Sequence, residues 1–256
     1  MPPAVIDLDG RVALVTGVSR GIGGHIARGF AAAGAAVVAQ YRSDAAYAEA
    51  LVAEIVAGGG QAVAIAADLS TEAACEAVVA ATVDAFGRLD ALVNNAGVQP
   101  VMPLAEMTLA DWSAVVDLNL GATFACTQAA ARVMSTAGGG SITHIASIEG
   151  SQPAYGHAHY AASKAAMIMH ARAAAIEYGP RGVRVNTVSP GLIHRAGIEA
   201  TWPSGVARWL AAAPLGRLGQ GSDVADACVF LASPMAAFIT GHDLVVDGGM
   251  SAHPTW

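Results

Sequence analysis

The sequence TGVSRGIG, Thr16 to Gly23, places three glycines at the spacing GxxxGxG. It stands between an apolar run, Val12–Thr16, and the alanine-rich segment Gly21–Ala33. Glycines allow the backbone of such a turn to adopt positive φ and to approach a ligand closely, and the N-terminus of the following helix attracts a phosphate group. A tight strand-to-helix turn without a ligand is the alternative interpretation, so the rest of the chain must decide between the two.

Short apolar runs alternate with amphipathic segments along the chain. The predicted strands are Val12–Thr16, Ala36–Tyr41, Ala62–Ala66, Ala91–Asn94, Ser141–Ser147, Val183–Val188 and Leu244–Val246. The predicted helices include Gly21–Ala33, Ala45–Ala57, Thr71–Phe86, Leu109–Ala131 and His159–Tyr178. Strands that are apolar throughout and alternate with helices are typical of a parallel sheet covered on both faces. The sequence therefore predicts one doubly wound α/β domain over residues 1–256.

Composition and charge exclude several classes of protein. Hydrophobic residues make up 54% of the 256 residues and charged ones 13%, so the chain can bury a large core. Its 20 acidic and 13 basic residues give a net charge of -7, whereas binding to nucleic acid or anionic lipid favours a basic face. No apolar run approaches the roughly 18 residues of a membrane span. We expect no nucleic-acid partner and no membrane association.

The cysteines and the N-terminus indicate a cytoplasmic protein. Cys75, Cys126 and Cys228 are far apart and form no CxxC pair, which argues against a disulfide framework and against a zinc site. The first residues lack the basic and then apolar layout of a signal peptide. We therefore expect three buried thiols, no metal and a cytoplasmic location.

Further motifs follow the glycine-rich turn in a fixed order. They are Asp68, Asn94-Asn95-Ala96-Gly97, Asn119, Ser147, Tyr160-Ala161-Ala162-Ser163-Lys164, Pro190-Gly191 and Asp247-Gly248-Gly249. Together these motifs resemble the short-chain dehydrogenase/reductase family, in its short single-domain subclass, and the resemblance covers nearly the whole chain. It implies a Rossmann fold whose seven-stranded parallel sheet has the order 3-2-1-4-5-6-7, an NAD(P) cofactor, and an enzyme acting on CH–OH groups.

The resemblance also assigns the residues that would hold the cofactor. They are Gly17, Ser19, Arg20, Gly21, Ile22, Gly23, Asp68, Leu69, Asn95, Gly97, Tyr160, Lys164, Pro190, Gly191 and Ile193. Asp68 would accept a hydrogen bond from the adenine amino group, although it could instead cap the helix that follows.

The end of the second predicted strand favours NADP(H) over NAD(H). An acidic side chain there would bond the ribose 2′-hydroxyl and repel a 2′-phosphate, but the strand ends in Arg42 and Ser43, and the first carboxylate is Asp44. A guanidinium group and a hydroxyl can bind a phosphate, and Arg20 can reach the same group. NAD(H) stays possible, because Arg42 could simply be solvated and Asp44 could turn back to the ribose.

Tyr160 and Lys164 form the predicted catalytic pair. They are four residues apart in a predicted helix, so their side chains share one face. A tyrosine hydroxyl has an ordinary pKa of about 10 and needs a nearby positive charge to exchange a proton near neutrality. An ammonium can supply that charge and also bond the nicotinamide ribose. Lys164 is the one lysine among the 13 basic residues, which favours this role over a solvated helix face.

Ser147 and Asn119 complete the predicted catalytic set. Ser147 ends the fifth predicted strand, at the sheet edge where doubly wound proteins bind ligands, and its hydroxyl can hold the substrate oxygen beside Tyr160. Asn119 lies within Leu109–Ala131, although asparagine is a poor helix former. By resemblance it distorts that helix and anchors a water beside Lys164, which completes a proton relay.

The substrate pocket is expected between residues 148 and 159 and after Pro190-Gly191, with residues 191–217 as a lid. The candidate substrate residues are Glu149, His157, His194 and Arg195. Arg195 stands where the family often has threonine, and it either binds an anionic substrate or is a solvated lid residue. His157 could bond a polyhydroxylated substrate, whereas we expect His159 to face the exterior of its helix.

The predicted activity is hydride transfer between NADP(H) and a small free ketone, alcohol or polyol. A 3-oxoacyl thioester carried on an acyl carrier protein is the alternative substrate, although docking of an acidic carrier favours a more basic chain. A nucleotide-sensing binding protein without catalysis is the alternative of another class. The resemblance further implies a homotetramer or a homodimer.

Overall fold

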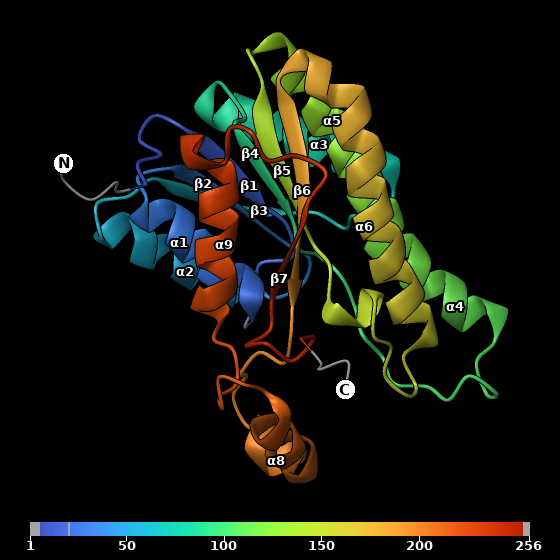
Figure 1. Cartoon of the computed structure of the whole chain (residues 1–256). Coiled ribbons are helices and arrows are strands. Elements are labelled where there is room, and N and C mark those ends of the chain that lie inside the picture. Colours follow the sequence, from blue (N-terminus) through green and yellow to red (C-terminus); the bar gives the residue numbers. More distant parts are fainter. Residues whose placement is uncertain (1–5, 20, 253–256) are drawn as a thin grey trace.

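The computed structural model describes residues 6–19 and 21–252. Seven parallel strands form one sheet in the order β3-β2-β1-β4-β5-β6-β7, which confirms the predicted order (Figure 1). The strands are β1 (Val12–Val15), β2 (Ala36–Tyr41), β3 (Ala62–Ala66), β4 (Ala91–Asn94), β5 (Gly140–Ile145), β6 (Val183–Pro190) and β7 (Asp243–Val246).

Nine α-helices and four shorter helical turns connect the strands within the described residues. The α-helices are α1 (Ile22–Ala32), α2 (Ala45–Ala57), α3 (Glu72–Phe86), α4 (Leu109–Val116), α5 (Ala122–Thr136), α6 (Ala158–Tyr178), α7 (Ile198–Thr201), α8 (Pro203–Ala212) and α9 (Gly221–Ala232). The short turns are η1 (Asp117–Gly121), η2 (Ile148–Gly150), η3 (Gly179–Arg181) and η4 (Pro234–Ala236).

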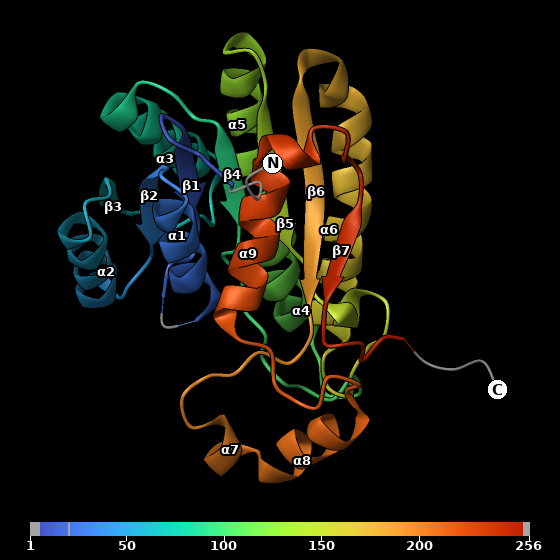
Figure 2. The ribbon, with the colours of Figure 1, turned by 60° about the vertical axis from the view of Figure 1, so that its left-hand side comes forward.

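The helices cover both faces of the sheet. Helices α1, α2 and α9 lie on one side, and α3, α5 and α6 lie on the other, as the two views agree (Figures 1 and 2). Strand β1 shows why: Ala13 and Val15 belong to the core under α1 and α9, whereas Leu14 between them belongs to the core under α3 and α5. Because successive side chains of a strand point to opposite faces, an apolar run of this kind requires cover on both.

The carboxyl ends of the parallel strands meet at one edge of the sheet. Helices α7 and α8 lie beyond this edge, below the sheet in Figure 2. They have a small core of their own, in which Ile198, Val206 and Leu218 are buried and Trp209 packs against them. The loops that hold the predicted site residues therefore converge between the sheet and these two helices.

Three elements differ from the sequence prediction. The helix expected over Leu109–Ala131 is interrupted by the π-helical turn η1 and continues in α5 to Thr136. Strand β5 ends at Ile145, so Ser147 lies two residues beyond it and caps η2 with its side chain. Helix α9 was not among the predicted helices, although Gln220 and Asp223 form a capping box at its start.

The described residues offer neither a membrane-spanning helix nor a metal site. None of their helices combines the length and the apolar character that crossing a membrane requires. The same residues contain no group of three or more His, Cys, Asp or Glu side chains placed to hold a metal ion. The cysteines Cys75, Cys126 and Cys228 are free and buried, and they pack as small apolar side chains in the two cores.

Candidate active site

The glycine-rich turn lies directly against the end of β4. Gly17 has a φ of +68°, and a Cβ atom there would lie 2.6 Å from the Cα of Ala96. A Cβ atom on Gly23, in the first turn of α1, would lie 2.6 Å from Asn95 Nδ2. Both positions therefore require glycine: Gly17 for the positive φ that was predicted, and Gly23 for its close packing against Asn95.

Asn95 fastens this turn to the sheet. Its Nδ2 donates to the carbonyl oxygens of Thr16 (2.9 Å) and Gly17 (3.0 Å), and its backbone N–H donates to Thr16 Oγ1 (3.0 Å). Gln40, buried in β2, accepts from the backbone N–H of Gly17 (2.8 Å) and donates to the carbonyl of Ala67 (2.8 Å). Gln40 was not predicted as a site residue, although an amide side chain in an otherwise apolar strand could have identified it.

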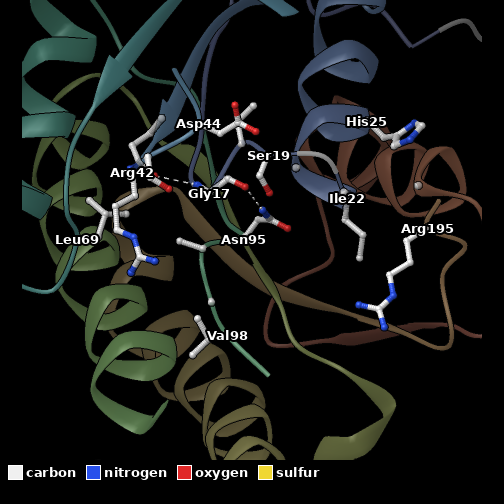
Figure 3. A pocket seen from close by; sticks show the side chains of 18 of the residues that line it. Gly17, Ser19, Ile22, His25, Arg42, Asp44, Leu69, Asn95, Val98 and Arg195 are labelled. Atoms are coloured by element: carbon white, nitrogen blue, oxygen red, sulfur yellow. Dashed lines mark hydrogen bonds between the residues drawn. The ribbon is translucent and has the colours of Figure 1, made fainter. Parts of the chain in front are cut away.

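A cavity of about 550 Å³ opens beside this turn (Figure 3). Twelve of the predicted cofactor residues line it: Gly17, Ser19, Gly21, Ile22, Gly23, Arg42, Ser43, Asp68, Leu69, Asn95, Gly97 and Ile193. Tyr160, Lys164, Pro190 and Gly191 are not among the lining residues, and Arg20 lies outside the described part of the chain. His25 lines the cavity as well, from α1, and was not predicted.

The cavity fits a dinucleotide. A Cβ atom at Gly17 or Gly23 would collide with Ala96 or Asn95, so these glycines let the turn pack against the residues after β4, whereas Gly21 faces open space. The cavity reaches from the N-terminal end of α1, which favours phosphate groups, to the ends of β2 and β3. Arg42 and Arg195 extend their guanidinium groups into it from opposite sides (Figure 3). The carboxylate of Asp44 caps α2 by accepting from Tyr47 N–H, and that of Asp68 accepts from Ser70 N–H.

His194 and Arg195, predicted to contact substrate, line this same cavity. His194 Nε2 lies 3.4 Å from Glu199 Oε1, at the start of α7. The predicted substrate residues are therefore divided between two places, because Glu149 and His157 lie instead beside Tyr160.

Tyr160 and Lys164 lie on one face of α6, next to the end of β5. Lys164 is 4% exposed, and its Nζ donates to the carbonyl of Ile145 (2.7 Å) and lies 5.4 Å from the centre of the Tyr160 ring. Ser147 is buried, and its hydroxyl lies close enough to Tyr160 for a hydrogen bond that lowers the pKa of the tyrosine. The structure thus brings three of the four predicted catalytic side chains together at the carboxyl edge of the sheet.

Burial shifts the pKa values of this pair in opposite directions. Burial raises the pKa of Tyr160 to about 12, the hydrogen bond with Ser147 opposes this, and the nearby Glu149 carboxylate adds to it. Burial lowers the pKa of Lys164 to about 8. From the sequence the ammonium was expected to lower the pKa of Tyr160, but in the structure that pKa is raised, and Ser147 is the group that opposes the rise.

Asn119, the fourth predicted catalytic residue, is buried in the π-helical turn η1. Its side chain accepts from Val98 N–H (2.8 Å) and donates to the carbonyl of Val98 (3.0 Å) and to Ser163 Oγ (3.2 Å). Helix distortion at this asparagine was expected, and the structure has it. The side chain joins the loop after β4 to α6 at the turn between Tyr160 and Lys164.

Three other histidines are notable: His159 departs from the prediction, and His144 and His170 were not predicted. His159, expected at the exterior of its helix, is fully buried, because α4 packs against the first turn of α6. Its Nδ1 accepts from Tyr160 N–H (2.9 Å). His144 and His170, which were not predicted as functional, stack behind Lys164 with Nε2 and Nδ1 3.2 Å apart. The pKa of His144 is lowered chiefly by burial, and further by the charges that His170 and Lys164 place near it.

These features define a class of site: a doubly wound domain with a cavity of dinucleotide size and a buried tyrosine–lysine pair at the same edge of its sheet. Comparison with known proteins agrees. Residues 17–251 match the family model described as enoyl-(acyl carrier protein) reductase. A 3-oxoacyl-[acyl-carrier-protein] reductase of Synechocystis sp. is 42% identical over 244 residues, covering 95% of this chain and 98% of that protein. D-threitol dehydrogenase of Mycolicibacterium smegmatis is 41% identical, covering 94% of this chain and 93% of that protein.

Among solved structures, 7α-hydroxysteroid dehydrogenase complexed with NADH and 7-oxo glycochenodeoxycholic acid superposes with a TM-score of 0.91. It is 36% identical in sequence and covers 96% of each chain. The chain belongs to the short-chain dehydrogenase/reductase family. It is therefore an oxidoreductase of the kind that acts on CH–OH groups, and its family binds NAD(P)(H).

Proposed function

We propose that this chain interconverts a carbonyl and a secondary alcohol of a small free substrate, with NADP(H) as the hydride carrier. The observation that carries the proposal is the buried Tyr160, with Ser147 and Lys164 beside it, at the sheet edge where the dinucleotide cavity opens. Ligands of doubly wound sheets bind at this edge.

In the reduction, Tyr160 donates its proton to the carbonyl oxygen. The bound dinucleotide supplies the hydride that the carbonyl carbon receives. Ser147 holds the oxygen, and Lys164 returns a proton to Tyr160, with Asn119 fixing the turn between them. A tyrosine with a pKa of about 12 carries its proton at neutral pH, and a lysine with a pKa of about 8 releases one readily. Alcohol oxidation runs through the same groups in reverse.

A substrate panel with both cofactors tests this mechanism. We expect the wild type to reduce ketones and to oxidise alcohols, and Tyr160→Phe to lose about a thousandfold in kcat while the Kd for cofactor changes less than about twofold. A variant that retains most of its activity refutes the role of Tyr160. Cofactor binding without turnover on the whole panel instead supports the alternative of a nucleotide-sensing protein.

The preference for NADP(H) rests on the end of β2. Arg42 extends into the cavity and Ser43 lines it, whereas Asp44 bonds the start of α2. The NADH-bound relative supports the alternative, NAD(H). A guanidinium–phosphate bond contributes about 2 kcal/mol, so Arg42→Ala should lower kcat/KM with NADPH about thirtyfold and leave NADH nearly unchanged. Better kcat/KM with NADH in the wild type contradicts this preference.

The relatives support two substrate classes. One of them is a D-threitol dehydrogenase, and another is a 3-oxoacyl-[acyl-carrier-protein] reductase. The net charge of -7 disfavours docking of an acidic carrier, so we favour the free substrate. A comparison of kcat/KM for a carrier-bound 3-oxoacyl thioester and for free ketones distinguishes them.

We also propose that residues 191–217, which include α7 and α8, act as a lid on one catalytic domain, and that the protein is a cytoplasmic homotetramer or homodimer. The place of α7 and α8 beyond the sheet edge supports the lid. Light scattering after size-exclusion chromatography measures the number of subunits.

A further inference from the structure

A cluster of three polar side chains lies beside Tyr160, outside the cavity for the dinucleotide. Gln99 comes from the loop after β4, Glu149 from η2, and His157 from the residue before α6. His157 Nδ1 lies 2.8 Å from Glu149 Oε2, and Gln99 Nε2 donates to Glu149 Oε1 (2.9 Å). Three separate segments therefore meet through this carboxylate.

The hydrogen bonds determine which nitrogen of His157 is available. A carboxylate oxygen only accepts, so Nδ1 of His157 carries the proton that it donates to Glu149. Gln99 Nε2 lies 3.5 Å from the same nitrogen, too far to compete with that bond. Nε2 of the neutral ring is then an acceptor, and it makes no hydrogen bond to any side chain or backbone group of residues 6–19 and 21–252.

This acceptor stands next to the reacting group. The rings of His157 and Tyr160 have centroids 6.1 Å apart and an interplanar angle of 68°. The Glu149 carboxylate is close enough to raise the pKa of Tyr160. The side chains of His157 and Glu149 are 15% and 16% exposed, so they are shielded but reachable. His157 therefore lies one ring away from the hydroxyl that would hold the substrate oxygen.

We propose that the cluster Gln99–Glu149–His157 binds a second hydroxyl group on the carbon next to the reacting one, so that the substrates are vicinal diols and the matching α-hydroxyketones. The hydroxyl donates to His157 Nε2, whose orientation Glu149 fixes, as a carboxylate fixes the histidine of a catalytic triad. In an α-keto acid that neighbouring carbon is itself a carboxylate, which would face the Glu149 charge and has no proton to donate to Nε2, so the site disfavours α-keto acids. This inference rests on the proposed function of Tyr160.

The alternative is that the cluster only holds η2 and the start of α6 together. Under that alternative, a change at His157 lowers stability or lowers kcat/KM equally for all substrates. Under the proposal, the change acts on the ratio of kcat/KM between a hydroxyketone and the ketone of the same skeleton. A site built to bond a hydroxyl discriminates strongly against the analogue that lacks it.

The experiment compares matched pairs: 3-hydroxy-2-butanone with 2-butanone, and 2-hydroxycyclohexanone with cyclohexanone, each with NADPH and NADH. We expect the wild type to favour the hydroxyketone about a hundredfold in kcat/KM. His157→Phe keeps a ring against Tyr160 but removes the acceptor, and it should lower that ratio at least tenfold. His242→Phe, the same exchange at an exposed histidine before β7, is the matched control.

The outcomes separate the two proposals. Turnover of the simple ketones without preference for the hydroxyketones, or an unchanged ratio in His157→Phe, overturns this inference and leaves the proposed function standing. The first of these outcomes needs only the wild type and so does not depend on whether the variant folds. Absence of turnover for every pair with both cofactors overturns the proposed function and this inference with it.

Discussion

Lys164→Met tests how much stability the buried ammonium costs the protein. Lys164 is 4% exposed and forms no ion pair with a carboxylate of the described residues. Its partners are the carbonyl of Ile145 (2.7 Å) and Met167 Sδ (3.5 Å). Methionine has a similar unbranched shape without the charge, so it fills the site and removes the cost of desolvation.

The magnitude follows from the pKa of Lys164, which burial lowers from 10.5 to about 8. A shift of this size corresponds to about 3 kcal/mol of destabilisation at pH values below about 8, where Lys164 is protonated in the folded protein. Between the two pKa values the unfolded chain binds a proton that the folded chain does not, so stability rises with pH. From about pH 7.5 to about pH 9.5 the wild type should gain about 2 kcal/mol relative to Lys164→Met.

Urea unfolding of both proteins at these two pH values measures the difference, and ionisations far from Lys164 cancel in it. The upper pH stays below the ordinary pKa of Tyr160, because the raised pKa of that hydroxyl makes stability fall once the unfolded tyrosine ionises. Lys164→Met should lack activity at both values. A stability difference that does not depend on pH would falsify the claim that Lys164 is buried as a charged group at neutral pH.

Two further predictions concern the scaffold of the site. Gly23→Ala forces a Cβ atom toward Asn95 Nδ2 and so displaces the glycine-rich turn. The Kd for cofactor, measured by fluorescence titration, should rise at least about tenfold. An unchanged Kd would show that the turn accommodates the added methyl group without moving its cofactor-binding residues. Asp90→Ala removes a buried carboxylate that accepts hydrogen bonds from Arg11 and Arg88. The free energy of unfolding should therefore fall by about 3 kcal/mol. A loss below about 1 kcal/mol would contradict a structural role for this carboxylate.

The fold could be predicted from the sequence because its signals are local. Strands β1 to β4 are short and mostly apolar runs, and the turn before α1 carries glycines where a Cβ atom would collide with the residues after β4. The strand order itself came from the family resemblance, since apolar runs alone do not say which strands are neighbours. A distortion of the helix at Asn119 was expected for the same reason, and the bonds of this side chain to Val98 and Ser163 explain why an asparagine is buried there.

The parts of the site that were missed depend on contacts between distant segments. His159 is buried because α4 packs against α6, and nothing in the periodicity of α6 says which of its faces α4 will cover. Gln99 joins Glu149 across 50 residues, so its part in the cluster could not be read from either segment alone. His144 and His170 meet across β5 and α6 in the same way.

The contrast between one lysine and twelve arginines acquires a physical reason at this site. A guanidinium group stays protonated at any pH a protein meets, so an arginine at position 164 could supply charge but could not return a proton to Tyr160. Burial acts on lysine and tyrosine in opposite directions, because it disfavours the charged form of each. One desolvated pocket thereby keeps the proton on Tyr160 and brings Lys164 to a pKa of about 8, where it can exchange protons near neutrality. In the proposed mechanism a lysine is needed where a group must gain and lose a proton, and the arginines of the dinucleotide cavity would serve where a fixed charge suffices.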